Sequence, residues 1–285
     1  MHALRHVLLL GLVSAHLLAA ASEQPLPDKD RFVAEVRARL RTDRALQAHY
    51  TFIERRQEIE ISKLGKVSAD VTKSYEVYPS ADPGFTYKRL ISVNGTPIPQ
   101  AELARNDEKH RRDLEHVAAS PSERAKQQQD IEKNRREERE AIDELFRVYD
   151  IHLVGRETLA GYPTIVGTLD PRPDYKPRSD DGRMMKRFRG RVWAHEFDYQ
   201  IVKVDLESVE DVTIGWGILA RLRKGAKVTL QRTKVNDEVW LPASLRVVGT
   251  GRTLMFRGFK IDSLTEWSDY KKFSVRTEEK LEIGP

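Results

Sequence analysis

The chain has 285 residues, a net charge of +5 at pH 7 and no cysteine. Without cysteine it has no lipid-modified N-terminal cysteine, no disulfide framework and no zinc–thiolate site. The surplus of positive charge is small for this length, and it is concentrated in residues 172–191, which hold eight Lys and Arg against three Asp.

Residues 1–21 have the pattern of an export signal. Arg5 precedes an apolar run, and Ala19 and Ala21 stand in the small-x-small arrangement that signal peptidase reads. The run is shorter than the ~20 apolar residues that a bilayer-spanning helix needs. We therefore expect cleavage after this segment and a periplasmic mature protein made of residues 22–285, folded as a single domain.

The first third of the mature chain predicts one helix followed by a β-meander. Apolar residues recur at helical spacing over residues 29–47. The period then changes to two over residues 50–62, 66–78 and 85–95, with turn signals at Gly65 and at the Asn-Gly pair that ends the last segment. Three consecutive antiparallel strands are the simplest arrangement of these segments.

Residues 100–148 are highly charged and are expected to form an insertion of two helices. Ser120, Pro121 and Glu123 fit an N-cap, a first-turn proline and a capping box, so the break between the helices should fall near Ser120. The apolar stripe stays thin until Ile142, which indicates that most of the first helix and the start of the second project into solvent. A partner-binding arm or a mobile lid over a cavity is the functional alternative.

The β pattern returns after the insertion. A hairpin is expected over residues 191–207, and an Asn-Asp pair and Gly249–Gly251 mark further turns. The other expected strands are two around Ala160-Gly161, then residues 224–235, 238–248, 252–264 and a short last one at 266–275. The predicted fold class is α+β, with a curved, largely antiparallel sheet that forms an incomplete barrel covered by helices.

The sequence contains no recognisable catalytic constellation. His195 and Glu196 are adjacent at a hairpin end, where a solvated or core-edge role is more common than catalysis or metal binding. There is no HExxH, G-x-S-x-G or P-loop motif, and Asp180-Asp181-Gly182 lacks the rest of a calcium loop. We therefore assign no catalytic residue, no metal and no cofactor; an envelope hydrolase would depend on His195 or Glu196.

The basic segment 172–191 is amphiphilic as well as cationic, because Met184, Met185 and Phe188 alternate with its charges. It could be a solvated loop that packs its apolar residues on the sheet. It could also contact anionic lipid headgroups, for which each Lys or Arg contributes ~1 kcal/mol near a charged membrane. The candidates for contact with headgroups or a partner are Arg183, Lys186, Arg187, Arg189 and Arg191.

The hairpin carries the pattern G-x-V-W-x…D-x-x-I-V-K-V from Gly190 to Val204, and V-W-L-P follows at residues 239–242. With the preceding helix and meander, this resembles the outer-membrane lipoprotein-sorting (LolA/LolB-like) superfamily, over residues 30–98 and 149–275. The resemblance implies an incomplete antiparallel barrel, helices over its open side and an apolar cavity that takes acyl chains. The charged insertion departs from that pattern.

These features favour a noncatalytic periplasmic lipid- or lipoprotein-binding carrier in outer-membrane biogenesis, with acyl chains or an acylated lipoprotein as partner and no nucleic acid. An envelope interaction or sensor module that binds a protein through residues 100–148 is the alternative. A curved sheet with an apolar concave face needs a helical cover, and small barrels commonly hold ligands. The candidate cavity residues are Trp193, Val202, Val204, Trp240, Phe256 and Phe259. For each of the four aromatic residues, a place in an ordinary hydrophobic core is the alternative.

Overall fold

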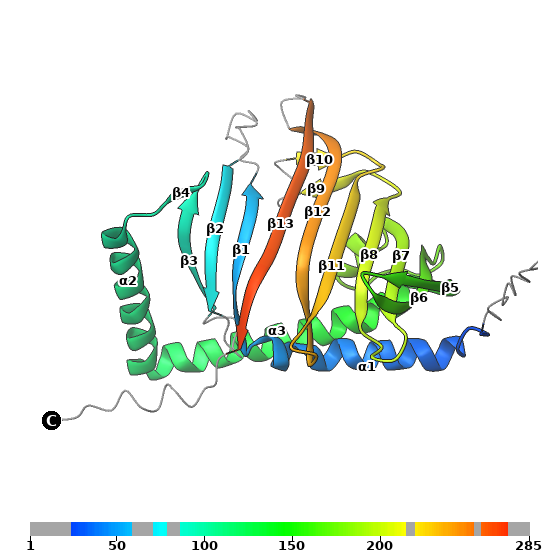
Figure 1. Cartoon of the computed structure of the whole chain (residues 1–285), viewed down its shortest axis with the longest axis horizontal. Coiled ribbons are helices and arrows are strands. Elements are labelled where there is room, and N and C mark those ends of the chain that lie inside the picture. Colours follow the sequence, from blue (N-terminus) through cyan, green and yellow to red (C-terminus); the bar gives the residue numbers. More distant parts are fainter. Residues whose placement is uncertain (1–23, 59–70, 79–85, 215–219, 254–257, 273–285) are drawn as a thin grey trace, which may run out of the picture.

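The computed structural model describes residues 24–58, 71–78, 86–214, 220–253 and 258–272. Within this part of the chain, thirteen strands form one sheet in which all paired strands are antiparallel (Figure 1). The strands are β1 (Tyr50–Glu58), β2 (Val71–Tyr78), β3 (Tyr87–Val93), β4 (Thr96–Pro97), β5 (Tyr149–Leu159), β6 (Tyr162–Pro171), β7 (Phe188–His195), β8 (Ile201–Ser208), β9 (Val212–Ile214), β10 (Ala220–Leu222), β11 (Lys227–Val235), β12 (Val239–Thr253) and β13 (Gly258–Lys272).

The strand β13 joins the two halves of the sheet. It pairs with β1 on one side and with β12 on the other, so the order along the sheet is β4-β3-β2-β1-β13-β12-β11-β8-β7-β6-β5. β10 pairs with the end of β12, and β9 pairs with β10. The sheet therefore depends on one pairing between strands that are far apart in sequence, while hairpins supply most of the others.

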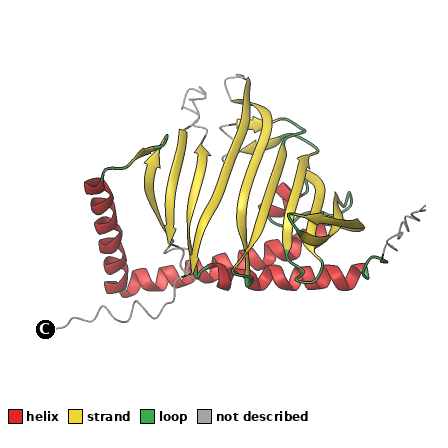
Figure 2. Cartoon of the chain, in the orientation of Figure 1, coloured by secondary structure: helices red, strands yellow, loops and turns green. Residues whose placement is uncertain are grey.

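The described residues form four helices: α1 (Lys29–Gln47), α2 (Gln100–Ala119), α3 (Pro121–Val148) and α4 (Asp180–Met185). In Figure 1, α1 and α3 run side by side across the lower part of the sheet, and α2 stands beside β3. The colouring in Figure 2 shows the strands as one curved sheet that is not closed into a barrel. The predicted fold class is thus confirmed.

The charged insertion forms two helices with a break at Ser120, as predicted. The Ser120 side chain accepts a hydrogen bond from the backbone N–H of Glu123 at 3.3 Å, and Pro121 occupies the first turn of α3. Leu103 is the only buried residue of α2. In α3 the buried residues, Glu144 and Val148, lie near its C-terminal end. The expectation that most of the first helix and the start of the second project into solvent is therefore confirmed.

Three expectations about the elements were wrong. β12 continues through Gly249–Gly251, where a turn was expected, and β13 includes residues 266–272, the described part of the segment expected to form a separate last strand. At Gly251, a Cβ would lie 2.7 Å from the backbone oxygen of Arg221 and 2.5 Å from the ring of Phe259, so this glycine permits close approach of β10 rather than a turn. α4 forms within the basic segment expected to be a loop. Several parts of the expected strands lie outside the described residues: 59–62, the turn at Gly65, 66–70, Phe85, 254–257 and 273–275.

Candidate functional site

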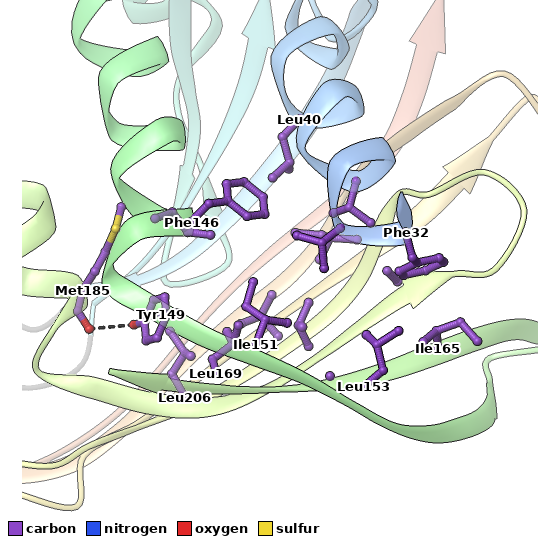
Figure 3. A pocket seen from close by; sticks show the side chains of 18 residues that line it. Phe32, Leu40, Phe146, Tyr149, Ile151, Leu153, Ile165, Leu169, Met185 and Leu206 are labelled. Carbon is purple, nitrogen blue, oxygen red and sulfur yellow. Dashed lines mark hydrogen bonds between the residues drawn. The ribbon is translucent and has the colours of Figure 1, made fainter. Parts of the chain in front are cut away.

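An apolar cavity of about 290 Å³ lies between α1, the C-terminal end of α3 and one face of strands β5 to β8 (Figure 3). Its lining is made almost entirely of aliphatic and aromatic side chains, and Tyr149 contributes the only hydroxyl. The lining residues are Phe32, Val33, Val36, Leu40, Leu145, Phe146, Tyr149, Ile151, Leu153, Ile165, Gly167, Leu169, Met185, Val192, Ala194, Ile201, Val204 and Leu206.

Cross-strand pairing brings the sheet residues of the cavity onto one face. Gly167 on β6 pairs with Val192 on β7, which in turn pairs with Val204 on β8. A Cβ at Gly167 would lie 3.3 Å from a methyl group of Val192, so the glycine lets this row pack closely without filling the hollow. Alternation along β6 and β7 sends the intervening side chains to the opposite face.

The N-terminal half of α1 supplies one wall. Phe32 and Val36 are four residues apart and both are buried, and Leu40 continues the same helical stripe. The ring of Phe32 lies 5.4 Å from the ring of Tyr199, which follows β7. In Figure 3, Phe32 and Leu40 reach from α1 towards the sheet side chains below them. The helix thus covers the apolar face rather than lying beside it.

The end of α3 and the short helix α4 form the opposite wall. The Tyr149 hydroxyl donates a hydrogen bond to the backbone oxygen of Met185 at 2.6 Å, which holds the Met185 segment against the cavity. Burial raises the pKa of Tyr149 well above its ordinary value. The phenol therefore stays protonated at neutral pH and acts as a structural donor.

Glu144, in the last turns of α3, holds α4 in place. Its buried carboxylate accepts hydrogen bonds from the backbone N–H and the hydroxyl of Ser179, from the backbone N–H of Arg178, and from the Tyr175 hydroxyl at 3.3 Å. Burial acts to raise the pKa of Glu144, but the hydrogen bonds outweigh this effect and lower it. A Cβ at Gly182 would lie 2.4 Å from this carboxyl group, so only glycine fits there.

A polar groove of about 490 Å³ borders the cavity and shares four of its wall residues, Val33, Phe146, Tyr149 and Ile151. Its other lining residues are Lys29, Asp30, Ala34, Arg37, Ala38, Asp150 and Arg172. The apolar hollow therefore meets a charged rim between α1 and the end of α3.

No protein-family model and no curated protein matches the sequence. The fold is similar to an outer membrane lipoprotein-sorting protein domain from Vibrio parahaemolyticus, covering 85% of this chain and 92% of that one at 11% identity and a TM-score of 0.32. It is also similar to a DUF1329 family protein from Desulfovibrio piger, covering 90% and 96% at 11% identity and a TM-score of 0.31. A third similar structure is MucB in complex with MucA(peri), covering 85% and 94% at 11% identity and a TM-score of 0.25. The first belongs to the class that the sequence resembles; these are similarities of fold and assign no activity to this chain.

Of the six candidate cavity residues, Val204 lines the cavity. Val202 is buried but does not line it, because β8 has an extra residue where Trp193 pairs with Lys203 and Ala194 pairs with Ile201. This bulge interrupts the alternation and places Ile201 in the cavity wall. Strict alternation in the sequence could not reveal it.

The two tryptophans and Phe259 lie elsewhere. The Trp193 indole N–H donates to Glu157 at 2.7 Å, and the Lys203 ammonium lies 4.6 Å from its ring centre. Trp240 is buried, and its N–H donates to Asp198 at 3.1 Å. Phe259 packs against a separate apolar cluster of Val212, Leu222 and Ala226. Phe256 lies outside the described residues.

The five basic candidates do not line the cavity or its charged rim. Arg183 pairs with Asp180, and Lys186 donates to the backbone oxygen of Pro173 at 2.8 Å. Arg187 contacts Glu210 at 3.3 Å. Arg189 and Arg191 line a separate surface groove that also contains Asp170, Asp205 and Glu207. Within the same segment, however, Met185 packs into the cavity wall, as the structural interpretation of the loop expected.

His195 organises the hairpin turn between β7 and β8. Its Nδ1 atom accepts hydrogen bonds from the backbone N–H groups of Asp198 at 2.9 Å and Phe197 at 3.3 Å. Glu196 forms an ion pair with Arg156 at 2.8 Å. In the described part of the chain, no group of three or more His, Asp or Glu side chains is placed to hold a metal ion. No helix there is long and apolar enough to cross a membrane.

Proposed function

We propose that this chain is a noncatalytic periplasmic protein that binds a lipid acyl chain, either as a free lipid or as the acylated end of a lipoprotein. The observation that carries the proposal is the cavity wall itself. Eighteen residues from α1, α3, α4 and four strands line it, and all of them present apolar surface to the hollow. Pockets for polar ligands hold several directed polar groups, whereas an acyl chain needs none.

The chemistry of the lining favours binding over catalysis. General acid–base and nucleophilic mechanisms need a titratable or nucleophilic side chain within hydrogen-bonding reach of the reacting atoms. The one hydroxyl in the wall, that of Tyr149, is committed to the backbone oxygen of Met185. Burial of methylene groups contributes about 0.8 kcal/mol each, so a chain of several carbons would be held by contact area alone. A carrier role additionally requires export, which the pattern of residues 1–21 supports.

A cavity-filling substitution tests the proposal. Ala194→Leu places a larger side chain in the wall, and Ala104→Leu adds the same atoms on the exposed surface of α2 as a matched control. With dodecanol as the probe and calorimetry as the measurement, we expect Ala194→Leu to weaken binding at least about tenfold, because the lost methylene burial exceeds 1.4 kcal/mol. The control should bind like the wild type. Absence of dodecanol binding by the folded wild type would refute the proposal.

A second candidate function is protein binding through the insertion. The observation that favours it is the exposure of α2, where Leu103 is the only buried residue and charged side chains are frequent on the remaining surface. Deletion of residues 100–120 separates the two functions. An acyl-binding protein should keep its affinity for dodecanol after the deletion, since the cavity uses no residue of α2. An interaction module should lose its partner in a pull-down from the envelope fraction.

A further inference from the structure

Arg172 stands in the charged rim of the cavity with few partners of its own. Its backbone N–H donates to Val148 at 2.8 Å, and its Nε donates to the backbone oxygen of Tyr149 at 3.1 Å. These two bonds fix the guanidinium beside the wall residue Tyr149. Among the described residues, no carboxylate forms an ion pair with Arg172, and the residue is exposed in the rim groove.

The other cations of the rim already have acidic partners. Arg37 pairs with Asp143 at 2.8 Å, and Lys29 lies 3.6 Å from Asp30. Asp150, an acid of the same groove, lies 3.2 Å from the exposed imidazole of His152, which forms an ion pair with it only when protonated. Arg172 is therefore the cation of this groove that lacks an acidic partner within the described ranges. A guanidinium with free N–H groups offers a forked donor for a carboxylate or a phosphate.

The volume of the apolar cavity limits how many acyl chains it can hold beside Arg172. At about 290 Å³ the cavity is at the lower end of the range for small-molecule pockets, which begins near 300 Å³. That space suits one acyl chain better than the two or three chains of a phospholipid or a lipoprotein terminus. Cavity and groove share four wall residues, and Arg172 is hydrogen-bonded to the backbone oxygen of one of them, Tyr149. A chain that extends from the cavity into the groove would therefore end beside Arg172.

We infer that the rim groove is the headgroup site of a single-chain anionic amphiphile, with Arg172 as the contact to its carboxylate or phosphate. The inference rests on the proposed acyl binding and names the class of ligand. It also moves the headgroup contact away from the basic segment 183–191, whose Arg189 and Arg191 line a different groove together with three acids.

A series of ligands with one chain and different heads tests this inference. Dodecanoate, dodecyl phosphate, dodecanol and dodecyltrimethylammonium are titrated into the full mature chain by calorimetry, at neutral pH and low salt. We expect both anions to bind about two- to fivefold more tightly than dodecanol, which is the range for an exposed ion pair. The advantage should shrink as salt is raised. The ratio of the two anions distinguishes a fatty acid from a lysophospholipid-type phosphate as the better model.

Two arginine variants assign the effect. Arg172→Gln should abolish the preference for anions while leaving dodecanol affinity unchanged, and Arg191→Gln, which removes the same charge from the other groove, should keep the preference. Equal affinity of the wild type for dodecanoate and dodecanol, tighter binding of the cationic amphiphile, or equal losses in both variants would overturn the headgroup site while the cavity proposal stands. Failure of all four probes to bind would overturn both.

Discussion

At the scale of single residues, Glu144 is a buried carboxylate held by neutral donors. Ser179, Arg178 and Tyr175 supply hydrogen bonds through backbone and hydroxyl groups, and within the described residues no cation pairs with it. A buried charge is tolerated when its hydrogen bonds are satisfied, and removing them leaves a desolvation cost. Glu144 thereby ties α3 to α4, and α4 in turn carries Met185 to the cavity wall.

Replacing this carboxylate should weaken the fold. We expect Glu144→Gln to lower the free energy of unfolding by about 2 kcal/mol, the typical worth of hydrogen bonds to a charged group, measured by urea denaturation at neutral pH. Glu140→Gln, on the exposed face of the same helix, is the control. The pKa of Glu144 is lowered in the folded chain, so its contribution is present above the ordinary value of 4.5 and is lost as pH falls through the folded value. The difference between wild type and variant should therefore shrink in acid; a constant difference would contradict this assignment.

At the scale of elements, α2 is docked to β3 by polar contacts. Arg89 donates to both oxygens of Asp107 at 2.9 to 3.1 Å, and the Tyr87 hydroxyl donates to the same carboxylate at 2.7 Å. The ring of His110 stacks on Tyr87 at 4.1 Å. With Leu103 as the only buried apolar residue of the helix, these contacts set its position.

Removing the negative charge of Asp107 should weaken the attachment of α2 to β3. Hydrogen bonds from Arg89 and Tyr87 lower the pKa of Asp107, so the contact is stable above the ordinary value of 3.8 and is lost as pH falls through the folded value. We expect Asp107→Asn to speed amide hydrogen exchange throughout residues 100–119 several-fold at neutral pH, while exchange in β6 and β7 stays unchanged. Asp113→Asn, at an exposed position of α2, is the matched control. Equal protection in both variants would show that Asp107 does not hold the helix.

Some of these elements could be predicted from the sequence, and others could not. The bounds of α1 and the break at Ser120 follow from local periodicity and capping, and both were predicted. The six-residue helix α4 is too short to show a period. The extra residue at Val202 makes the side chains of β8 before it point to the opposite face from the one that strict alternation predicts. Gly251 lies within a strand and allows the backbone of β10 to approach closely, whereas the sequence suggested a turn. Both features depend on partners that local patterns do not contain.

At the scale of the whole molecule, the cavity arises from elements distant in sequence. Phe32 of α1 meets Ile165 of β6 and Ala194 of β7 in one buried cluster, although each segment by itself reads as an ordinary amphipathic helix or strand. The large aromatic residues Trp193 and Trp240 were the natural sequence candidates for a cavity wall, yet their N–H groups find acidic partners elsewhere. A buried indole needs a hydrogen-bond acceptor for its N–H group. An acidic side chain supplies one and the apolar cavity does not, so the two tryptophans lie beside the acids.

If the cavity binds an acyl chain as proposed, exchange of that ligand should depend on the contact between the two helices that cover the cavity. The rim groove lies between α1 and the end of α3, where Arg37 pairs with Asp143 at 2.8 Å and its guanidinium lies 5.5 Å from the ring centre of Phe146. Phe146 lines both the cavity and the groove, so we expect separation of these helices to open a path for the ligand. Because the ion pair is partly exposed, breaking it costs about 1 kcal/mol or less and should not unfold the chain.

We therefore expect Arg37→Gln to speed the dissociation of dodecanol about two- to fivefold in stopped-flow measurements, since the lost contact is worth less than about 1 kcal/mol. The uncharged probe separates this effect from headgroup binding in the same groove. Arg31→Gln removes an exposed charge from the first turn of α1 without touching the groove and should leave the rate unchanged. An unchanged rate in Arg37→Gln would mean that the ligand leaves by another path, and a rate raised equally in both variants would point to loosening of α1 as a whole rather than to its contact with α3.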